Sequence, residues 1–245
     1  MNRSSFKGFS ATGLRLLALF FMLLDHLWAT VIPGNNWMTW LGRLAFPIFA
    51  FQLAEGFFHT SNRKAYAKRL LVFALVAEVP FDLMYIGAPF FIFHQNVMFT
   101  LLLGFLAMWA LEKARSGGTP LAWAKGAALA GLCLLGGLLG FVDYGAMGVA
   151  TVLLFYLARK LPLTPLWQAA GLYLLNIRWF KGETLIFTLA GREMFFPTQG
   201  FAVLALLPIW LYNGQKGRGG RLLQYGSYLF YPAHMLLLWA LRTFL

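Results

Sequence analysis

Ionisable side chains inside apolar segments are the residues of this sequence best placed to do chemistry. Arg15 and His26 stand eleven residues apart in the first apolar segment. Eleven residues make close to three helical turns, so both side chains leave the same helix face, about 16 Å apart along the axis. This face could hold an anion at Arg15 and a general base at His26. The spacing fits equally well a snorkelling arginine and a hydrogen-bonded core histidine.

Asp25 and Arg43 form a second candidate pair. Asp25 precedes His26, but adjacent helical residues do not face each other, so we expect Asp25 to form a buried salt bridge with Arg43. Pro47 should kink the helix and free the carbonyl group of Arg43. A buried arginine beside a broken helix could bind a carbonyl, carboxylate or phosphate group.

Two further pairs of ionisable residues have helical spacing. Glu55 and His59 are four residues apart and could pair with each other near one end of their helix. Glu78 and Asp82 are also four apart, with Pro80 between them. Paired carboxylates could do acid–base work. The reading we favour is that these two balance arginines inside a helix bundle.

His234 is the second histidine of an apolar segment, and it shares a helix face with Tyr231. It could act as an acid, a base or a substrate binder, or be a core histidine. Asp143 sits at the edge of another apolar segment, and we expect His94 to lie mostly on the surface.

The composition requires a membrane for these segments. Of 245 residues, 60% are hydrophobic and 11% charged, whereas an ordinary globular domain is about 25% charged. We therefore expect an all-α, polytopic transmembrane helix bundle forming one domain over residues 1–245. The nine candidate spans are 12–32, 37–58, 66–87, 96–112, 121–140, 143–158, 165–180, 195–212 and 225–244. Residues 180–194 contain four charges and are predicted to be an interfacial or re-entrant piece.

The basic residues predict an orientation. The net charge is +12, and the basic residues lie between alternate apolar segments, which indicates cytoplasmic loops rather than a nucleic-acid site. They are Arg3, Lys7, Arg63, Lys64, Lys68, Arg69, Lys113, Arg115, Lys125, Arg159, Lys160, Lys216, Arg218 and Arg221. The N-terminus is then cytoplasmic and the C-terminus lies outside, although the loop near 178–192 departs from the pattern. Such loops could also contact anionic membrane lipid or an anionic cofactor.

No metal is expected. The single cysteine, Cys133, lies in an apolar segment and matches no metal or redox motif. The sequence also lacks H-E-x-x-H, G-x-S-x-G, Walker A and G-x-G-x-x-G patterns.

Taken together, these segments resemble the TraX family along nearly the whole chain. The similarity is carried, in order, by Leu14-Arg15-Leu16, Met22 to His26, Gly42 to Phe51, Glu55-Gly56-Phe57, His59-Thr60, Arg69-Leu70, Pro80-Phe81-Asp82, Asn96 to Thr100, Asp143-Tyr144-Gly145 with Gly148, and Tyr231 to His234. TraX proteins are known as pilin acetylases, which acetylate the amino terminus of F-type pilin. The spacing from Arg15 to His26 also resembles the first-helix motif of the membrane acyltransferase-3 enzymes, which transfer acetyl groups to acceptors on the outer side.

The resemblance implies roles for the residues singled out above. His26 would be the catalytic base, Arg15 a contact to the acetyl-CoA donor, and Arg43 a second donor contact or a polariser of the acyl carbonyl group, with Asp25 as its partner. The anionic end of acetyl-CoA would be held by Arg15 together with Arg63, Lys64 and Arg69. Substrate-binding or supporting roles would fall to Glu55, Asp82, Asp143, Tyr231 and His234.

The expected protein is thus a multi-pass acetyltransferase of the bacterial inner membrane. It would move an acetyl group from cytoplasmic acetyl-CoA to an outer acceptor, with a pilin amino terminus as one candidate. Two alternatives stay open: O-acetylation of a cell-surface glycan or lipid-linked sugar, and a non-enzymatic transporter or envelope-assembly protein. Transporters often show inverted repeats with broken helices, and no internal repeat is visible here.

Overall fold

The protein is mostly helical, as the sequence predicts. The computed structural model describes residues 8–180, 182–189 and 191–244. The predictions for Arg3 and Lys7, and for Lys181, one of the four charged residues of 180–194, fall outside the described residues. Within these ranges, three helices are long and apolar enough to cross a membrane: Ala11–Thr30, Val97–Gly117 and Pro120–Leu139. The chain is therefore built as a helical membrane protein.

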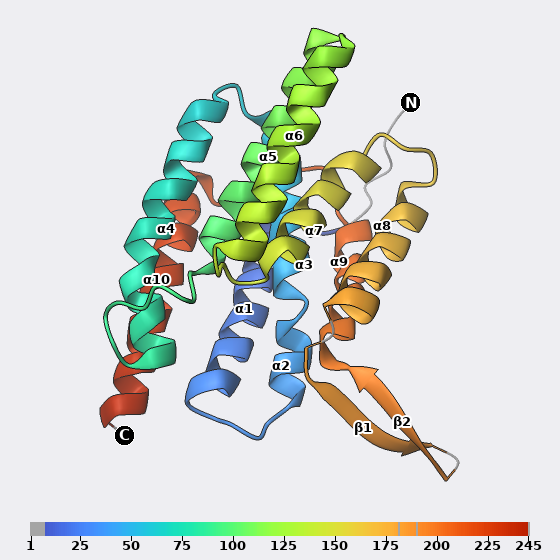
Figure 1. Ribbon diagram of the computed structural model, residues 1–245. Coiled ribbons are helices and arrows are strands. Elements are labelled where there is room, and N and C mark those ends of the chain that lie inside the picture. Colours follow the sequence, from blue (N-terminus) through green and yellow to red (C-terminus); the bar gives the residue numbers. More distant parts are fainter. Residues whose placement is uncertain (1–7, 181, 190, 245) are drawn as a thin grey trace.

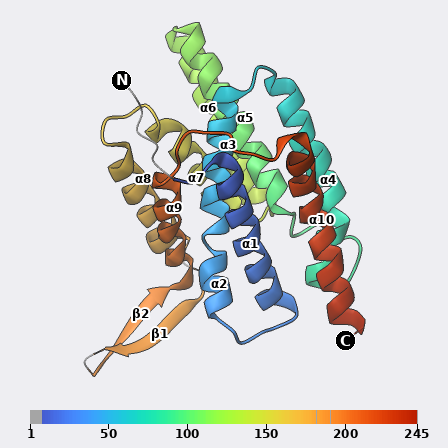
Figure 2. The ribbon, with the colours of Figure 1, turned by 180° about the vertical axis from the view of Figure 1, so that it is seen from behind.

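The elements follow the predicted apolar segments closely in the first two thirds of the chain. They are α1 (Ala11–Thr30), α2 (Trp37–Gly42), α3 (Ala45–His59), α4 (Arg63–Ile86), α5 (Val97–Gly117), α6 (Pro120–Leu139), α7 (Gly145–Ala158), α8 (Thr164–Tyr173), the π-helix η1 (Leu174–Trp179), β1 (Thr184–Leu189), β2 (Arg192–Pro197), the 3-10 helix η2 (Thr198–Ala205), α9 (Leu206–Trp210) and α10 (Gly220–Phe244). Figures 1 and 2 show α4 and α10 side by side along one flank of the bundle.

Polar caps set the ends of the long helices. The side chains of Ser10, Asn62 and Asn96 each accept a hydrogen bond from a backbone N–H in the first turn of the helix that follows. At the other end, Gly87 ends α4 with a φ of 78°, a left-handed conformation that glycine adopts without steric cost. These caps fix where the helices begin and where α4 ends.

The predicted span 37–58 is interrupted. Helix α2 ends at Gly42 and α3 starts at Ala45, so the break falls at Arg43 and Leu44. Pro47 explains it, because a regular helix needs an N–H at residue 47 to donate to the Arg43 carbonyl group, and proline has none. The expected irregularity at Arg43 is confirmed, and it places this residue at the end of a short helix.

Residues 184–197 form an antiparallel β-hairpin instead of the predicted interfacial or re-entrant piece. Thr184 pairs with Pro197 and Leu189 with Arg192. The two strands together contain three phenylalanines, two threonines and one isoleucine, and such residues favour extended backbone over helix. The hairpin projects away from the helices in Figure 1. The helical periodicity used for the other segments could not reveal it.

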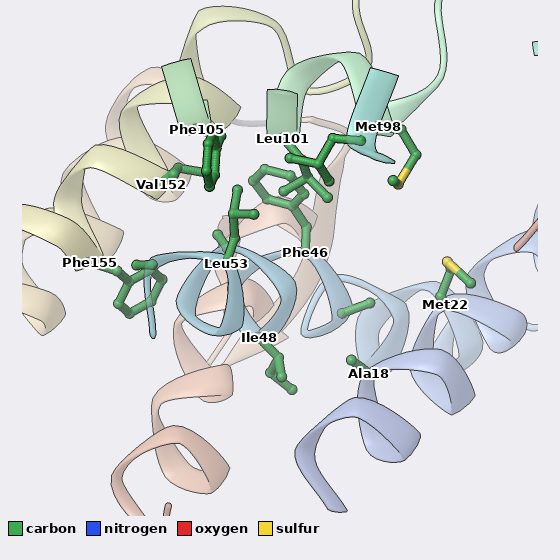
Figure 3. Close-up of a cluster of buried hydrophobic side chains, with 14 of the residues drawn as sticks. Ala18, Met22, Phe46, Ile48, Leu53, Met98, Leu101, Phe105, Val152 and Phe155 are labelled. Atoms are coloured by element: carbon green, nitrogen blue, oxygen red, sulfur yellow. The ribbon is translucent and has the colours of Figure 1, made fainter. Parts of the chain in front are cut away.

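The core is centred on α3. Its buried side chains pack against α1 on one side and against α5 and α7 on the other. Figure 3 shows this cluster, in which Phe46, Ile48 and Leu53 of α3 lie among Ala18, Met22, Leu101, Phe105, Val152 and Phe155. Helix α3 therefore lies at the centre of the core. Helix α1, which carries Arg15 and His26, packs against it.

Candidate functional site

Two buried histidines meet at the centre of the site. Nδ1 of His26 on α1 lies 2.7 Å from Nε2 of His234 on α10, across a sequence separation of 208 residues. The ring planes are parallel within 6°, and the centroids are 4.9 Å apart. Both residues are buried, at 8% and 4% exposure. The sequence marks each histidine as a candidate, but only the fold shows that they form one hydrogen-bonded pair.

Helix α10 holds His234 from two sides. Its Nδ1 lies 2.8 Å from the backbone oxygen of Phe230, one turn earlier in the helix. The ring of Phe230 lies parallel to the imidazole, with centroids 4.8 Å apart. Tyr231 lies 5.9 Å from the same ring and is itself buried. The shared helix face predicted for Tyr231 and His234 is confirmed, and His234 has no free ring nitrogen.

Asp25 and Arg43 form the predicted salt bridge. Nη2 of Arg43 donates to Oδ1 of Asp25 at 2.9 Å. Thr39 completes the cluster: its hydroxyl donates to Asp25 at 2.6 Å and accepts from Nη2 of Arg43 at 2.7 Å. Gly42 permits the close approach, because a Cβ there would collide with the Asp25 side chain. Asp25 thus orients Arg43 and does not contact His26 by a hydrogen bond.

Tyrosines surround this centre. Tyr85 lies edge-on to His26, with centroids 6.0 Å apart. Tyr144 stacks on Phe46, with ring centroids 4.1 Å apart, and lies beside the Arg43 guanidinium. Neither Thr39 nor Tyr85 was identified as a site residue from the sequence. Thr39 could have been found from its spacing of four residues before Arg43, whereas Tyr85 carries no such signal.

Glu78 and Asp82 do not balance arginines within the described part of the chain, so that interpretation was wrong. Oε2 of Glu78 accepts hydrogen bonds from the backbone and side-chain nitrogens of Asn96. Oδ2 of Asp82 accepts from the backbone N–H of Phe91 at 2.7 Å. The reason is local: the loop after α4 turns back over α4 and brings N–H groups that need acceptors. Both carboxylates hold the α4–α5 connection in place.

His94 is more deeply placed than a surface loop residue. It packs against Phe81 at 4.9 Å and Tyr85 at 5.8 Å between ring centroids. Its Nε2 faces Oδ1 of Asp143 at 3.9 Å. The Asp143 carboxylate raises the pKa of His94 above its usual value. Asp143, predicted at an outer edge, thereby links the α4–α5 and α6–α7 connections beside the buried centre.

Arg15 opens a cavity that runs along the predicted face of α1. The cavity has a volume of about 130 Å³. Its wall includes Arg15, Leu19 and Met22 on α1, one turn apart, and it reaches Tyr231 next to His234. Helices α3, α4, α5 and α10 supply the remainder of the wall, through residues such as Gln52, Tyr66, Met98 and Ser227. The cavity therefore extends from the level of Arg15 to Tyr231, which packs beside His234, and the two histidines lie beyond its wall.

The basic residues proposed as donor contacts are spread over the start of α4. The Arg63 guanidinium lies 4.3 Å above the Phe57 ring, and the Arg69 guanidinium lies 5.2 Å from Tyr66, a wall residue of the cavity. Arg63 and Lys64 line a separate open depression with Trp109 and residues 60–62. Of the three, Arg69 is connected to the cavity most directly.

Glu55 lies away from the histidine pair. Its carboxylate accepts from Nε of Arg159 at 2.7 Å, and the predicted contact with His59 is present at 3.7 Å. It ties α3 to the end of α7, at the opposite end of α3 from Arg43. Among the described residues, no group of three His, Cys, Asp or Glu side chains could hold a metal ion.

Comparison with known proteins decides the family. The family model described as TraX protein matches residues 10–242, which include every site residue discussed above. The chain belongs to the TraX family. The chain is also 32% identical, over 263 residues, to the probable fimbrial assembly protein FimC, serogroup H1, of Dichelobacter nodosus, and 97% of each protein is covered. No solved structure matches it.

Membership of the TraX family confirms the resemblance drawn from the sequence. The quoted motifs fall on the elements that build the site: Arg15 and His26 on α1, Arg43 at the α2–α3 break, and His234 on α10. These pieces of sequence are far apart in the chain, and the fold collects most of them around the histidine pair.

Proposed function

We propose that this TraX-family protein is a membrane-bound acetyltransferase that uses acetyl-CoA. The observation that carries the proposal is the order of features along α1: Arg15 on the wall of a cavity, Met22 farther along the same wall, and the buried imidazole of His26 one turn beyond Met22. Acyl transfer from a thioester requires these three features, namely a cationic hold on an anionic donor, a slot for a narrow acyl-bearing arm, and a base.

The donor enters from the Arg15 end. Acetyl-CoA carries its phosphates at the nucleotide end, and arginine binds phosphate with two parallel hydrogen bonds. Arg15 is half-buried at the cavity, and Arg69, Arg63 and Lys64 extend a positive field outward from it. The thioester end then points along Leu19 and Met22 toward Tyr231 and His234.

The chemistry takes place at the histidine pair. His26 takes the proton of the acceptor amine or hydroxyl as that nitrogen or oxygen attacks the acetyl carbonyl carbon. Arg43, held by Asp25 and Thr39, stabilises the negative charge that develops on the carbonyl oxygen. The carbon–sulfur bond then breaks, and the departing thiolate takes the proton from His26, so the protein returns to its starting state.

The orientation in the membrane follows from the basic connections. The α3–α4, α5–α6 and α7–α8 connections, which carry the basic residues, lie at the same end of the bundle in Figures 1 and 2. The α1–α2 connection and the hairpin lie at the opposite end. Placing the basic end in the cytoplasm gives an inner-membrane protein crossing nine times, with the broken spans α2–α3, α8–η1 and η2–α9 each counted once.

The acceptor is proposed to be the amino terminus of a pilin. The relative from Dichelobacter nodosus bears the name of a fimbrial assembly protein, which points to the same class of acceptor as the family. The acceptor approaches His26 from the outer end, past Asp143 and His94.

Acetyl transfer by the purified protein tests the proposal. The protein in detergent is incubated with acetyl-labelled acetyl-CoA and a peptide with a free amino terminus, and the same peptide with a blocked amino terminus is the control. We expect label on the free peptide alone. Label on a glycan acceptor instead would favour O-acetylation. No hydrolysis and no transfer with any acceptor would contradict the acetyltransferase and return the transporter to consideration.

The orientation has its own test. Reporter domains fused to the two ends should show the N-terminus in the cytoplasm and the C-terminus outside. Both ends on the same side would mean an even number of crossings, and the region between α8 and α9 would be the place to look for the missing or extra one.

A further inference from the structure

We propose that His234 is a positioning residue that holds His26 in the tautomer whose Nε2 can accept a proton. The proposal deepens the proposed function, because it explains how a buried histidine becomes a base with a defined reactive atom. The tautomer itself is a property of the folded protein, so it can be measured without any catalysis.

The argument starts at the backbone of α10. A carbonyl oxygen accepts hydrogen bonds and cannot donate them. Nδ1 of His234 lies 2.8 Å from the backbone oxygen of Phe230, so Nδ1 must carry the hydrogen. A neutral imidazole carries one hydrogen in total, so Nε2 of His234 is then a bare acceptor.

The acceptor role of Nε2 in His234 in turn determines which nitrogen of His26 carries the hydrogen. Nε2 of His234 lies 2.7 Å from Nδ1 of His26. With Nε2 bare, the bond is formed only if Nδ1 of His26 carries the hydrogen and donates it. The remaining ring nitrogen of His26, Nε2, is therefore unprotonated. The backbone oxygen of Phe230 therefore fixes which nitrogen donates and which accepts in both hydrogen bonds.

The ring geometry fits an in-plane bond. Two imidazoles joined nitrogen to nitrogen at 2.7 Å, with centroids 4.9 Å apart and planes within 6°, lie edge to edge. This is the arrangement in which the N–H points along the lone pair of the acceptor nitrogen. Phe230 packs parallel to His234 and restricts its rotation. His234 is thus held before the reaction begins.

The arrangement has a consequence in the reacting state. When Nε2 of His26 takes a proton, the new imidazolium still donates through Nδ1 to a bare, buried nitrogen. A charge-assisted hydrogen bond is stronger than a neutral one, so the pair stabilises the protonated base more than the resting one. His234 does so without touching the substrate, which separates its role from that of a catalytic residue.

Nitrogen-15 NMR of the four histidines provides the test. Ring shifts of histidine-labelled protein in detergent distinguish Nδ1–H from Nε2–H, and the His26→Ala variant identifies the His26 signals. We expect the Nδ1–H tautomer for His26 in the wild-type protein. In His234→Gln the amide oxygen can replace the accepting nitrogen, so the tautomer should persist. In His234→Leu it should shift toward Nε2–H.

Acetyl transfer should follow the tautomer. We expect His234→Gln to stay within about tenfold of wild type, and His234→Leu to lose between about tenfold and about 10⁴-fold. The upper bound is the loss seen when the residue that fixes the histidine tautomer of a Ser–His–Asp triad is replaced. A purely packing role predicts instead that the apolar leucine is tolerated better than glutamine.

The outcomes separate the two proposals. An Nε2–H tautomer of His26 in the wild-type protein would overturn the positioning role, even if His234→Leu does not fold. An unchanged tautomer in folded His234→Leu would overturn it as well. The expected tautomers in a protein without acetyl-transfer activity would support the positioning geometry and remove the proposed function.

Discussion

The two ends of the α1 face differ in how their groups are held. At the end that carries His26, which we call the outer end after its proposed orientation, His26 has a hydrogen-bond partner in His234, and Arg43 has Asp25 and Thr39. At the other end, Arg15 lines a cavity, and Arg63 and Arg69 lie over aromatic rings. Hydrogen bonds fix the orientation of the side chains at the first end. The second end consists of arginine guanidinium groups on long, flexible side chains.

The difference matches what the two ends are proposed to do. Acid–base chemistry depends on atoms held within a fraction of an ångström, since misplacement by about 1 Å can cost 10²-fold in rate. Capture of a charged donor depends on the sum of several charges and tolerates movement. Substitutions at the outer end should therefore disturb stability or chemistry, and substitutions at the other end should disturb binding.

The largest effect on stability is expected from Arg43→Leu. The substitution leaves the mostly buried Asp25 carboxylate, 15% exposed, without its arginine. Breaking a fully buried pair costs about 3–5 kcal/mol, and we expect a loss near the lower end of this range. Thermal unfolding in detergent measures the loss. The double variant with Asp25→Leu removes both charges and should recover most of it. A single variant as stable as wild type would mean that the pair does not organise the outer end.

A smaller effect, on binding, is expected from Arg15→Ala. Losing the charge-assisted contact of Arg15 with a phosphate group should weaken acetyl-CoA binding about 10-fold to 100-fold. The difference between wild type and variant should shrink at high salt, because ions screen the charges. Calorimetry at two salt concentrations measures both effects.

Lys125→Ala is the matched control for Arg15. Lys125 is an exposed cation on α6 and does not line the cavity. Its replacement lowers the net charge by the same amount as Arg15→Ala, so acetyl-CoA binding by this variant should stay near that of wild type. Equal affinities of wild type and Arg15→Ala would remove Arg15 from the donor site.

The smallest effect is a pH dependence of stability that arises between the α4–α5 and α6–α7 connections. Asp143 raises the pKa of His94 above 6.5, so protonated His94 stabilises the folded protein. This stabilisation is complete below about pH 6.5 and is lost as pH rises through the raised pKa. It amounts to at most about 1 kcal/mol, because His94 is partly solvated. Thermal unfolding across this range should be flatter for His94→Gln, and identical profiles would contradict the link to Asp143.

The sequence predicted the individual polar residues better than their pairing. Charged groups in apolar segments stand out because lipid and core make them costly, and this identified His26, Arg43 and His234. The Asp25–Arg43 bridge was also predicted, because nearby groups of opposite charge in adjacent spans have few alternatives. The contact of His26 with His234 was not, since nothing local relates two residues 208 positions apart.

The errors have physical causes as well. Glu78 and Asp82 were read as partners of arginines, but the α4–α5 connection offers them backbone and amide donors. The hairpin at 184–197 was missed because its strands are only six residues long and lack the strict alternation of polar and apolar residues that marks a strand. Both errors lie in connections, where the apolar periodicity of membrane helices carries no information.

The most direct test of the account is acetyl transfer by His26→Ala beside His59→Ala. Both variants lose one histidine, but His59 is exposed and contacts Glu55, far from His234. Removing a general base should lower the rate by about 10²–10⁴-fold in folded His26→Ala, with acetyl-CoA binding retained and His59→Ala near wild type. Full activity of a correctly folded His26→Ala protein would contradict the assignment of His26 as the base.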